Sequence, residues 1–140
     1  MVYTSRAVYS YQCFYSTTDV IVEVSDNIIH TGTSYTKVIE FELANKIHPD
    51  SILDLFFQIR NEVGGETTTG AWYLNGTLYS PEYTQTGVVW LDKTTDITTP
   101  LNRGDVLTLY SKTTAGGQAS TRVHRIRGKS SPFSVSYIKP

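Results

Sequence analysis

The sequence predicts an all-β protein, an antiparallel two-sheet β-sandwich of jelly-roll type with about eight to ten strands. Thr, Tyr, Val and Ile dominate the composition, and these residues suit a pleated, half-buried surface. Turn signals recur along the chain at the spacing expected of a sandwich or barrel. With 140 residues, of which 39% are hydrophobic, we expect one domain over residues 1–140 that buries roughly two-thirds of its unfolded surface.

Taken in order, alternating or apolar runs bounded by Gly, Pro or Asn predict the strands. The predicted strands are residues 2–15, 19–24, 35–43, 52–60, 70–74, 77–80, 88–91, 105–112, 120–128 and 133–138.

The segment HPDSILDLFFQIRNEV, residues 48–63, fits two patterns. A helix capped at Asp50 or Ser51 would have one apolar face, formed by Ile52, Leu55, Phe56 and Ile59. A strand would have two faces, formed by Leu53, Leu55, Phe57 and Ile59 on one side and by Asp54, Phe56, Gln58 and Arg60 on the other. We favour the strand, because an all-β chain needs a central apolar strand and this is its best candidate.

The segment AWYLNGTLYS predicts a tight hairpin. Asn75-Gly76 is a preferred pair for a two-residue type I′ turn, in which both central residues need a positive φ. Thr77 completes a glycosylation sequon with this pair. The hairpin accounts for these residues without a sugar.

Arg103-Gly104-Asp105 spells an adhesion tripeptide, but its surroundings favour a structural turn. Pro100 and Asn102 precede it, and an alternating strand follows at once. Gly104 supplies a backbone conformation that other residues disfavour, and Asp105 can accept hydrogen bonds from nearby amides. We therefore interpret the tripeptide as the corner that leads into a strand.

The order of segments carries a resemblance. An apolar strand (ILDLFFQIR), a Gly-rich loop (EVGGETTTG), the Asn-Gly hairpin, a Thr-rich segment (YTQTGVVWLDKTTD), LNRGDVLTLYSK and ASTRVHRIRGK follow one another over about residues 50–128. This order resembles small jelly-roll modules of virion proteins, including structural and receptor-binding proteins of phages and of viruses of thermophilic archaea. The Gly-Asp strand entry is also similar to that of complement-type and tumour-necrosis-factor-type jelly rolls. The resemblance implies two antiparallel sheets, a place in a particle or trimer, and no catalytic residues.

Charge is distributed unevenly around a net charge of −1. Residues 1–100 hold five Lys/Arg and twelve Asp/Glu, whereas residues 101–140 hold seven and one. A basic interaction strand is formed by Arg122, Arg125, Arg127 and Lys129. Strand alternation puts Arg125 and Arg127 on one face with Val123, and Arg122 opposite. We expect acidic partners on neighbouring strands, such as Glu40, Glu42 or Asp54. Nucleic-acid binding is the less favoured alternative, because aromatic residues do not interleave with these arginines.

No catalytic signature stands out. The three histidines, His30, His48 and His124, have no metal-binding spacing, and Cys13 is the sole cysteine. Alternation puts Glu40 and Glu42 on the solvent face of a strand. Asp92 and Asp96 could ligate calcium in a loop, but a solvated loop is the favoured interpretation. The sequence predicts no catalytic, cofactor-binding or metal-binding residues.

Five aromatic residues cluster in the middle third and are candidates for a ligand platform or a subunit interface: Trp72, Tyr73, Tyr79, Tyr83 and Trp90. Exposed Trp and Tyr rings can act as flat platforms for sugars. Packing in a core or interface is the favoured reading for each ring, because amphipathic aromatics serve both places well.

These observations predict a non-enzymatic structural or interaction module, a capsid or surface protein of a virion that self-associates as a homo-oligomer or binds other virion proteins. The alternative is a carbohydrate-binding module that uses the exposed Trp and Tyr residues to hold a glycan. No apolar run is long enough to span a membrane. The N-terminal stretch MVYTSRAVYSYQ lacks the apolar core of a secretory leader. We expect the virion as location, with the host cytoplasm or secretion as alternatives.

Overall fold

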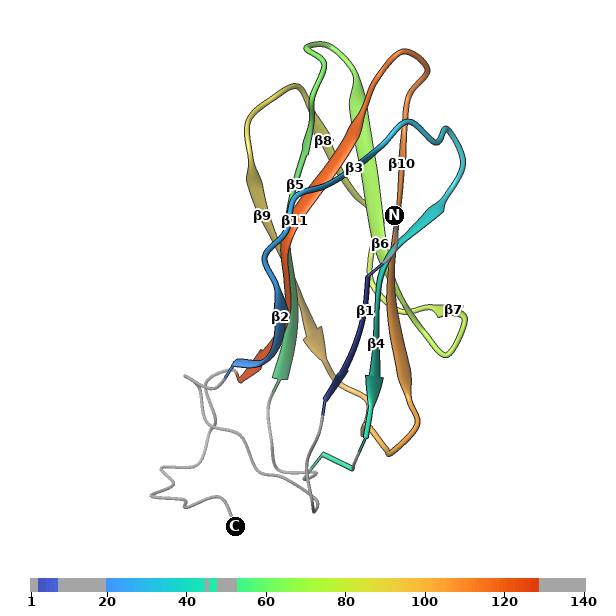
Figure 1. The fold of residues 1–140 in the computed structure, drawn as a ribbon, viewed down its shortest axis with the longest axis vertical. Coiled ribbons are helices and arrows are strands. Elements are labelled where there is room, and N and C mark those ends of the chain that lie inside the picture. The colour runs from blue at the N-terminus through green and yellow to red at the C-terminus, as the bar shows by residue number, and fades with distance from the viewer. Residues whose placement is uncertain (1–2, 8–19, 45, 48–52, 129–140) are drawn as a thin grey trace.

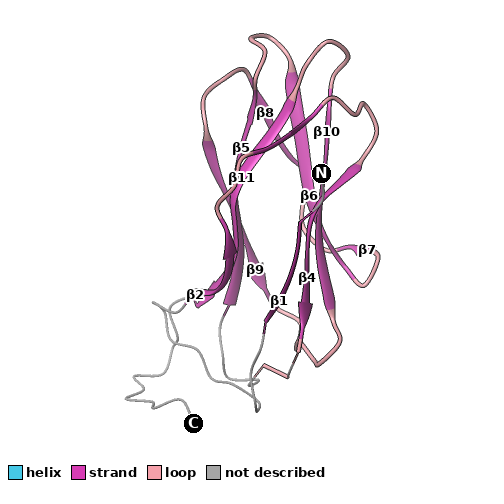
Figure 2. Ribbon diagram, viewed as in Figure 1, coloured by secondary structure: helices cyan, strands magenta, loops and turns pink. Residues whose placement is uncertain are grey.

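The computed structural model describes residues 3–7, 20–44, 46–47 and 53–128. Two β-sheets face each other across a common core (Figure 1), and the described residues form strands and loops without a helix (Figure 2). That part of the chain therefore holds no helix long and apolar enough to cross a membrane. The strands are β1 (Tyr3–Ala7), β2 (Val20–Val24), β3 (Ile28–His30), β4 (Thr36–Leu43), β5 (Leu53–Asn61), β6 (Thr67–Leu74), β7 (Thr77–Leu78), β8 (Tyr83–Thr86), β9 (Leu91–Ile97), β10 (Val106–Thr113) and β11 (Ala119–Gly128).

The strand order is that of a jelly roll. The six-stranded sheet runs β1-β4-β10-β6-β7, with β8 also paired to β6, and the five-stranded sheet runs β2-β11-β5-β9, with β3 also paired to β11. The chain crosses between the sheets at β1–β2, β3–β4, β4–β5, β5–β6, β8–β9, β9–β10 and β10–β11, and the last six crossings interleave β4-β10-β6-β8 with β3-β11-β5-β9. Every pairing is antiparallel except that of β1 with β4, which is parallel. The β-sandwich prediction is confirmed, with eleven strands in the described residues instead of eight to ten.

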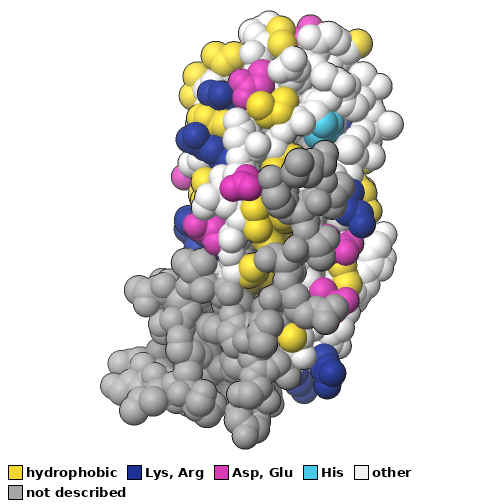
Figure 3. Space-filling model, in the orientation of Figure 1, with side chains coloured by type: hydrophobic (Ala, Val, Ile, Leu, Met, Phe, Trp, Pro, Cys, Tyr) yellow, Lys and Arg dark blue, Asp and Glu magenta, His cyan; other side chains and the backbone are white. Residues whose placement is uncertain are grey.

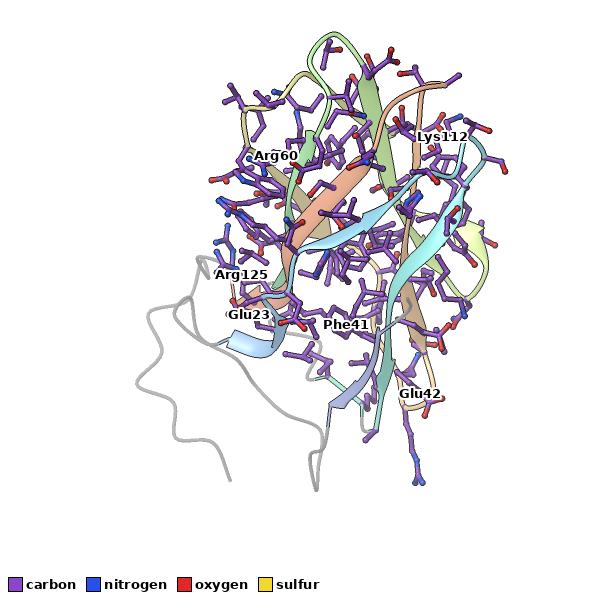
Figure 4. All side chains as sticks on the ribbon, turned by 45° about the horizontal axis from the view of Figure 1, so that its top comes forward. Glu23, Phe41, Glu42, Arg60, Lys112 and Arg125 are labelled. Atoms are coloured by element: carbon purple, nitrogen blue, oxygen red, sulfur yellow. The ribbon has the colours of Figure 1, made fainter. Side chains whose placement is uncertain are left out.

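Strand β5 confirms the strand interpretation of the ambiguous segment. Leu55, Phe57 and Ile59 are fully buried and face the other sheet, as the alternation predicted. Phe57 meets Trp72 edge to face at 6.1 Å between ring centroids, and Phe41 stacks on Trp72 at 6.2 Å. Phe41 lies between the two sheets (Figure 4). This apolar layer holds the sheets together.

Gly70 of β6 makes room for one of these rings. A Cβ at this position would lie 3.1 Å from the Phe57 ring, which is too close for an undisturbed contact. The absence of a side chain at Gly70 therefore lets the ring of Phe57 enter the core.

The Thr-rich segment differs from the prediction. Residues 83–86 and 91–97 form β8 and β9, and residues 88–91 mainly make the connection between them. Asp92 and Asp96 consequently lie on a strand and not in a solvated loop. The short strand β3 was not predicted. Several predictions concern residues outside the described ranges: Cys13, His48, Lys129, the strand at 133–138 and most of the strand at 2–15.

The Asn-Gly and Arg-Gly-Asp corners meet at one end of the six-stranded sheet. Asn75 and Gly76 have φ values of 50° and 84°, as a type I′ turn requires. The Asp105 carboxylate accepts hydrogen bonds from the Asn102 amide at 2.7 Å and from the Asn75 side chain at 3.0 Å. Gly104 has a φ of 87°, and its amide donates to the Leu43 carbonyl at 2.8 Å. The acidic group of the tripeptide is thus engaged in holding two turns together, which supports the structural-turn interpretation.

Substitutions in the tripeptide separate the two interpretations. We expect Asp105→Ala to lower the free energy of unfolding by about 1–3 kcal/mol, because two hydrogen bonds to a charged acceptor are lost. Arg103→Ala serves as the control and should change stability by less than about 0.5 kcal/mol, since the side chain is exposed. Urea denaturation measures both. Equal stability of the two variants, together with loss of cell attachment by both, would restore the adhesion reading.

Candidate functional site

Trp72 belongs to the core and not to a ligand platform. Its side chain is 0% exposed and is enclosed by Phe41 and Phe57. Alternation along β6 explains this placement, because Thr68, Gly70 and Trp72 face the other sheet. The proposed role of Trp72 in a ligand site is therefore wrong.

Tyr79 and Tyr83 pack against the core, and their hydroxyls already have partners. The Tyr79 hydroxyl accepts hydrogen bonds from the amides of Thr98 and Thr99 at 2.8 and 3.2 Å. The Tyr83 hydroxyl donates to the Thr94 carbonyl at 2.8 Å. These two residues link the β7–β8 region to β9, which is a structural role.

Trp90 lies at the outer face of the five-stranded sheet. The guanidinium carbons of Arg60 and Arg122 are 4.3 and 4.1 Å from the centroid of its ring system. Cation–π contacts of this kind stabilise by about 0.5–1 kcal/mol at exposed sites. The half-buried indole is therefore held by two arginines.

The predicted basic strand follows the same outer face, with one correction. A β-bulge shifts the register of β11 between Arg122 and Arg125, and Val123 within it has a φ of 55°. The extra residue puts Arg122 on the same face as Arg125 and Arg127 and not on the opposite one. The contacts of the three side chains agree with this placement. Arg122 donates to the Gln58 side chain at 2.7 Å, and Arg125 and Arg127 lie over the Phe56 ring at 4.2 and 4.6 Å.

Acidic residues balance this face, but of the three predicted partners only Asp54 does so, because Glu40 and Glu42 lie on β4 in the six-stranded sheet. Arg127 pairs with Asp54 at 2.8 Å, Arg125 with Glu23 at 3.1 Å, and Arg60 with Glu62 at 2.9 Å. Figure 3 shows both charges alternating along the edge where the five-stranded sheet lies. The four arginines of this face, Arg60, Arg122, Arg125 and Arg127, stand against five acidic groups, Glu23, Asp54, Glu62, Asp92 and Asp96. A net charge of −1 among these nine residues lacks the basic excess that nucleic-acid binding requires.

The outer face of the six-stranded sheet carries a different set of side chains. Tyr73 and Tyr110 are half-buried and make an edge-to-face contact at 4.9 Å between ring centroids. They lie diagonally on neighbouring strands, because Tyr73 pairs with Thr108 in the register of β6 and β10. Tyr35, immediately before β4, contacts Tyr73 at 6.2 Å. We call Tyr35, Tyr73 and Tyr110 the tyrosine cluster.

Tyr35 also makes a hydrogen bond across the outer face of the six-stranded sheet. Its hydroxyl donates a hydrogen bond to the Glu82 carboxylate. Tyr35 precedes β4 and Glu82 precedes β8, so this bond spans the two strands between them, β10 and β6. Burial raises the pKa of the Tyr35 phenol, and the bond to Glu82 raises it further. The phenol therefore stays protonated and keeps donating over the physiological pH range.

An open pocket of about 400 Å³ adjoins the tyrosine cluster. It is lined by Thr33, Thr67, Thr69, Lys112, Thr113, Thr114 and Ala115. The Lys112 ammonium lies 4.7 Å from the centroid of the Tyr35 ring and so connects the pocket with the tyrosine cluster. Figure 4 shows Lys112 on the side of the sandwich opposite to Arg60 and Arg125. We call the cluster, Lys112 and this pocket together the tyrosine face.

Only one of the five predicted aromatics, Tyr73, lies on the tyrosine face. Tyr35 and Tyr110 were missed, although the alternation of Tyr110 with buried Leu109 and Ser111 already indicated an outward side chain. What the sequence lacked was the pairing of β10 with β6, which brings Tyr110 beside Tyr73.

A serine–histidine pair in the interior does not have the arrangement of a nucleophile and its base. His30 Nε2 lies 2.6 Å from Ser111 Oγ, while His30 Nδ1 accepts a hydrogen bond from the Gly32 amide. The imidazole proton must therefore sit on Nε2 and point at Ser111, whereas a general base needs that nitrogen free. Among the residues that the structure describes, no three His, Cys, Asp or Glu side chains are grouped so as to hold a metal ion.

His124 is fully buried and neutral. Its Nδ1 donates to the Val24 carbonyl at 2.9 Å, so its Nε2 must accept from the Thr121 hydroxyl at 2.8 Å. Burial lowers the pKa of His124 to about 4, against the opposing effects of the Val24 carbonyl and of Asp26. This histidine is a structural link between β2 and β11.

The shifted pKa of His124 predicts a pH dependence of stability. Above pH 6.5 the residue is neutral in both folded and unfolded chains. Between pH 6.5 and about 4 only the unfolded chain binds the proton. The free energy of unfolding therefore decreases as the pH is lowered through this range, by about 3 kcal/mol in total. His124→Gln should remove this part of the dependence in urea denaturation between pH 4 and 8. Parallel stability curves for the two proteins would contradict the assignment.

Comparison with known proteins finds a similarity of fold only. No family model and no curated protein matches the chain. Among solved structures, it is similar to the CBM22-1 xylan-binding domain of Paenibacillus barcinonensis Xyn10C, with a TM-score of 0.48 and 11% identity over 83% of this chain and 98% of that one. It is also similar to the N-terminal CBM22-1-CBM22-2 tandem domain of the same protein, with a TM-score of 0.46 and 12% identity over 87% of this chain and 48% of the tandem.

Proposed function

We propose that the protein is a non-catalytic binding module that holds a carbohydrate chain on its tyrosine face. The observation that carries this proposal is the grouping of Tyr35, Tyr73 and Tyr110 next to a pocket rich in hydroxyls. Jelly rolls occur in both lectin and capsid domains, so the fold alone does not decide between these functions.

The chemistry of the tyrosine face suits a sugar. A half-exposed tyrosine ring offers an apolar surface to the C–H face of a pyranose, and its hydroxyl offers a hydrogen bond. The threonine hydroxyls and Lys112 add directional polar groups at one end of the cluster. Ligand sites usually combine apolar surface with a few placed polar groups in this way.

Aromatic substitutions on opposite sides of the sandwich test the proposal. We expect Tyr73→Ala to weaken binding of the best oligosaccharide on a glycan array at least tenfold, or about 1.4 kcal/mol, in isothermal titration calorimetry. Trp90→Ala is the matched control and should bind as the unmodified protein does, because Trp90 lies on the other sheet. Thermal unfolding checks that both variants are folded. Absence of any glycan ligand, or loss of binding in Trp90→Ala alone, would contradict the proposal.

Self-association is a second candidate function, and a separate surface favours it. Val88, Val89 and Leu91 in the β8–β9 connection are 50%, 64% and 40% exposed, and neighbouring exposed apolar side chains often mark protein contacts. Figure 3 shows hydrophobic side chains at the upper left, where this connection lies in Figure 1.

We expect an oligomer in multi-angle light scattering that Val89→Lys converts to a monomer. A strict monomer at high concentration would count against it. Location in a virion stays a prediction.

A further inference from the structure

Only some of the hydroxyl groups that line the pocket make hydrogen bonds within the protein. The hydroxyls of Thr67, Thr113 and Thr114 donate to or share hydrogen bonds with neighbouring protein groups. Those of Thr33 and Thr69 make no hydrogen bond within the described residues, although both line the pocket. The wall of the pocket therefore holds two hydroxyls that have no hydrogen-bond partner among the described residues and can donate to a ligand.

Lys112 gives the pocket a positive charge. Within the part of the chain that the structure describes, its ammonium has no carboxylate partner, in contrast to Lys37, which pairs with Glu40 at 3.1 Å. The Tyr35 ring lies 4.7 Å from the Lys112 nitrogen and holds it beside the pocket. Lys112 is also the sole charged residue among those that line it.

The carboxylate of Glu66, which bonds to a threonine of the pocket wall, is already engaged. Glu66 accepts a hydrogen bond from the Thr114 hydroxyl and is not among the residues that line the pocket. The polar groups that remain free are thus one ammonium, which can only donate, and two hydroxyls, which can donate as well as accept. A ligand group that only accepts hydrogen bonds and carries a negative charge matches this set best.

We propose that the pocket receives the carboxylate of an acidic sugar, with Lys112 as its ion-pair partner and the Thr33 and Thr69 hydroxyls as further donors. The inference rests on the proposed carbohydrate function and names the class of ligand: an oligosaccharide that contains a hexuronate. The tyrosine cluster holds a neighbouring ring of the same chain, because Tyr35 contacts both the cluster and Lys112.

The test compares ligands that differ only in the carboxylate. Oligosaccharides of glucuronate, galacturonate and mannuronate, each paired with its carboxyl-reduced form, are titrated into the full chain by calorimetry at low salt. At least one pair should show a preference of about two- to fivefold for the acidic form, the upper part of the range expected of one ion pair in a partly open site. The preference should shrink as salt is raised, because the charges are screened.

Variants of Lys112 complete the test. Lys112→Met should abolish the preference by lowering the affinity for the acidic oligosaccharide more than that for the reduced one, and Lys112→Arg should retain part of the preference. Equal binding of acidic and reduced forms, an equal loss of both in Lys112→Met, or tighter binding of a sulfated oligosaccharide would overturn the inference and leave the proposed function standing. Failure of both forms to bind would also overturn the inference, and it would contradict the proposed function itself if the glycan array shows no ligand either.

Discussion

Replacement of Asn61 by alanine is expected to lower the free energy of unfolding by about 3–5 kcal/mol. Asn61 is fully buried at the end of β5, and its side chain makes four hydrogen bonds. Its Nδ2 donates to Thr68 of β6 at 3.0 Å and to Thr113 of β10 at 2.9 Å. Its Oδ1 accepts from the amides of Val63 and Gln118 at 2.9 and 3.1 Å. Alanine would leave the amides of Val63 and Gln118 without this partner and would take a donor from the hydroxyls of Thr68 and Thr113, which keep their bonds to the Arg60 and Thr114 carbonyls. Each lost bond costs about 1–3 kcal/mol where water cannot enter.

The position of Asn61 explains why the effect should be large. The residue joins the five-stranded sheet to two strands of the six-stranded sheet and to two loops. Gly117 packs against it so closely that an added Cβ would lie 2.9 Å from Asn61 Nδ2. Loss of the amide would therefore loosen this entire end of the sandwich.

Urea denaturation of Asn61→Ala and of a matched control measures the effect. Asn102→Ala serves as the control, because Asn102 is exposed and its side chain makes no hydrogen bond within the described residues. We expect the control to change stability by less than about 0.5 kcal/mol. Similar small losses in both variants would show that Asn61 does not join the sheets.

Replacement of Trp72 by alanine should destabilise the protein by about 3–5 kcal/mol, the range found for large aromatic side chains in cores. The indole lies between Phe41 and Phe57 with no exposed surface. Its Nε1 has no hydrogen-bond partner among the described residues. Trp72→Phe should therefore cost much less, because apolar packing is largely kept and no hydrogen bond is lost.

Tryptophan fluorescence and ligand titration separate this core role from a platform role. In Trp90→Phe the remaining emission comes from Trp72 and should be blue-shifted and insensitive to ligand, since the indole is buried. Thermal unfolding of Trp72→Ala gives the loss of stability. A stable Trp72→Ala protein that no longer binds its glycan would show that Trp72 contacts the ligand.

The sequence predicted those features that depend on local patterns. Alternation placed Leu55, Phe57 and Ile59 in the core, and the Asn75-Gly76 pair defined its hairpin. The Gly104 corner was predicted because only local backbone requirements were involved. These features follow from one segment at a time, so no knowledge of strand pairing was needed.

Features that depend on pairing between distant strands were missed. Residues 71–73 of β6 read Ala-Trp-Tyr, and either aromatic could have faced outward until the pairing of β6 with β10 and β8 set which of its faces meets the core. The bulge at Val123 reversed the face of Arg122, which period-two alternation cannot anticipate. Tyr35 reaches across two strands to Glu82, a residue 47 positions away in the chain.

We propose that the tyrosine face, and not the tryptophans, is the recognition surface. An NMR titration of ¹⁵N-labelled protein with the best oligosaccharide from the array tests it most directly, because amide shifts report every residue at once. We predict that the largest perturbations fall on Tyr35, Tyr73, Tyr110, Lys112 and the threonines of the pocket. Perturbations centred instead on Trp90 and the arginines of the five-stranded sheet would contradict the account.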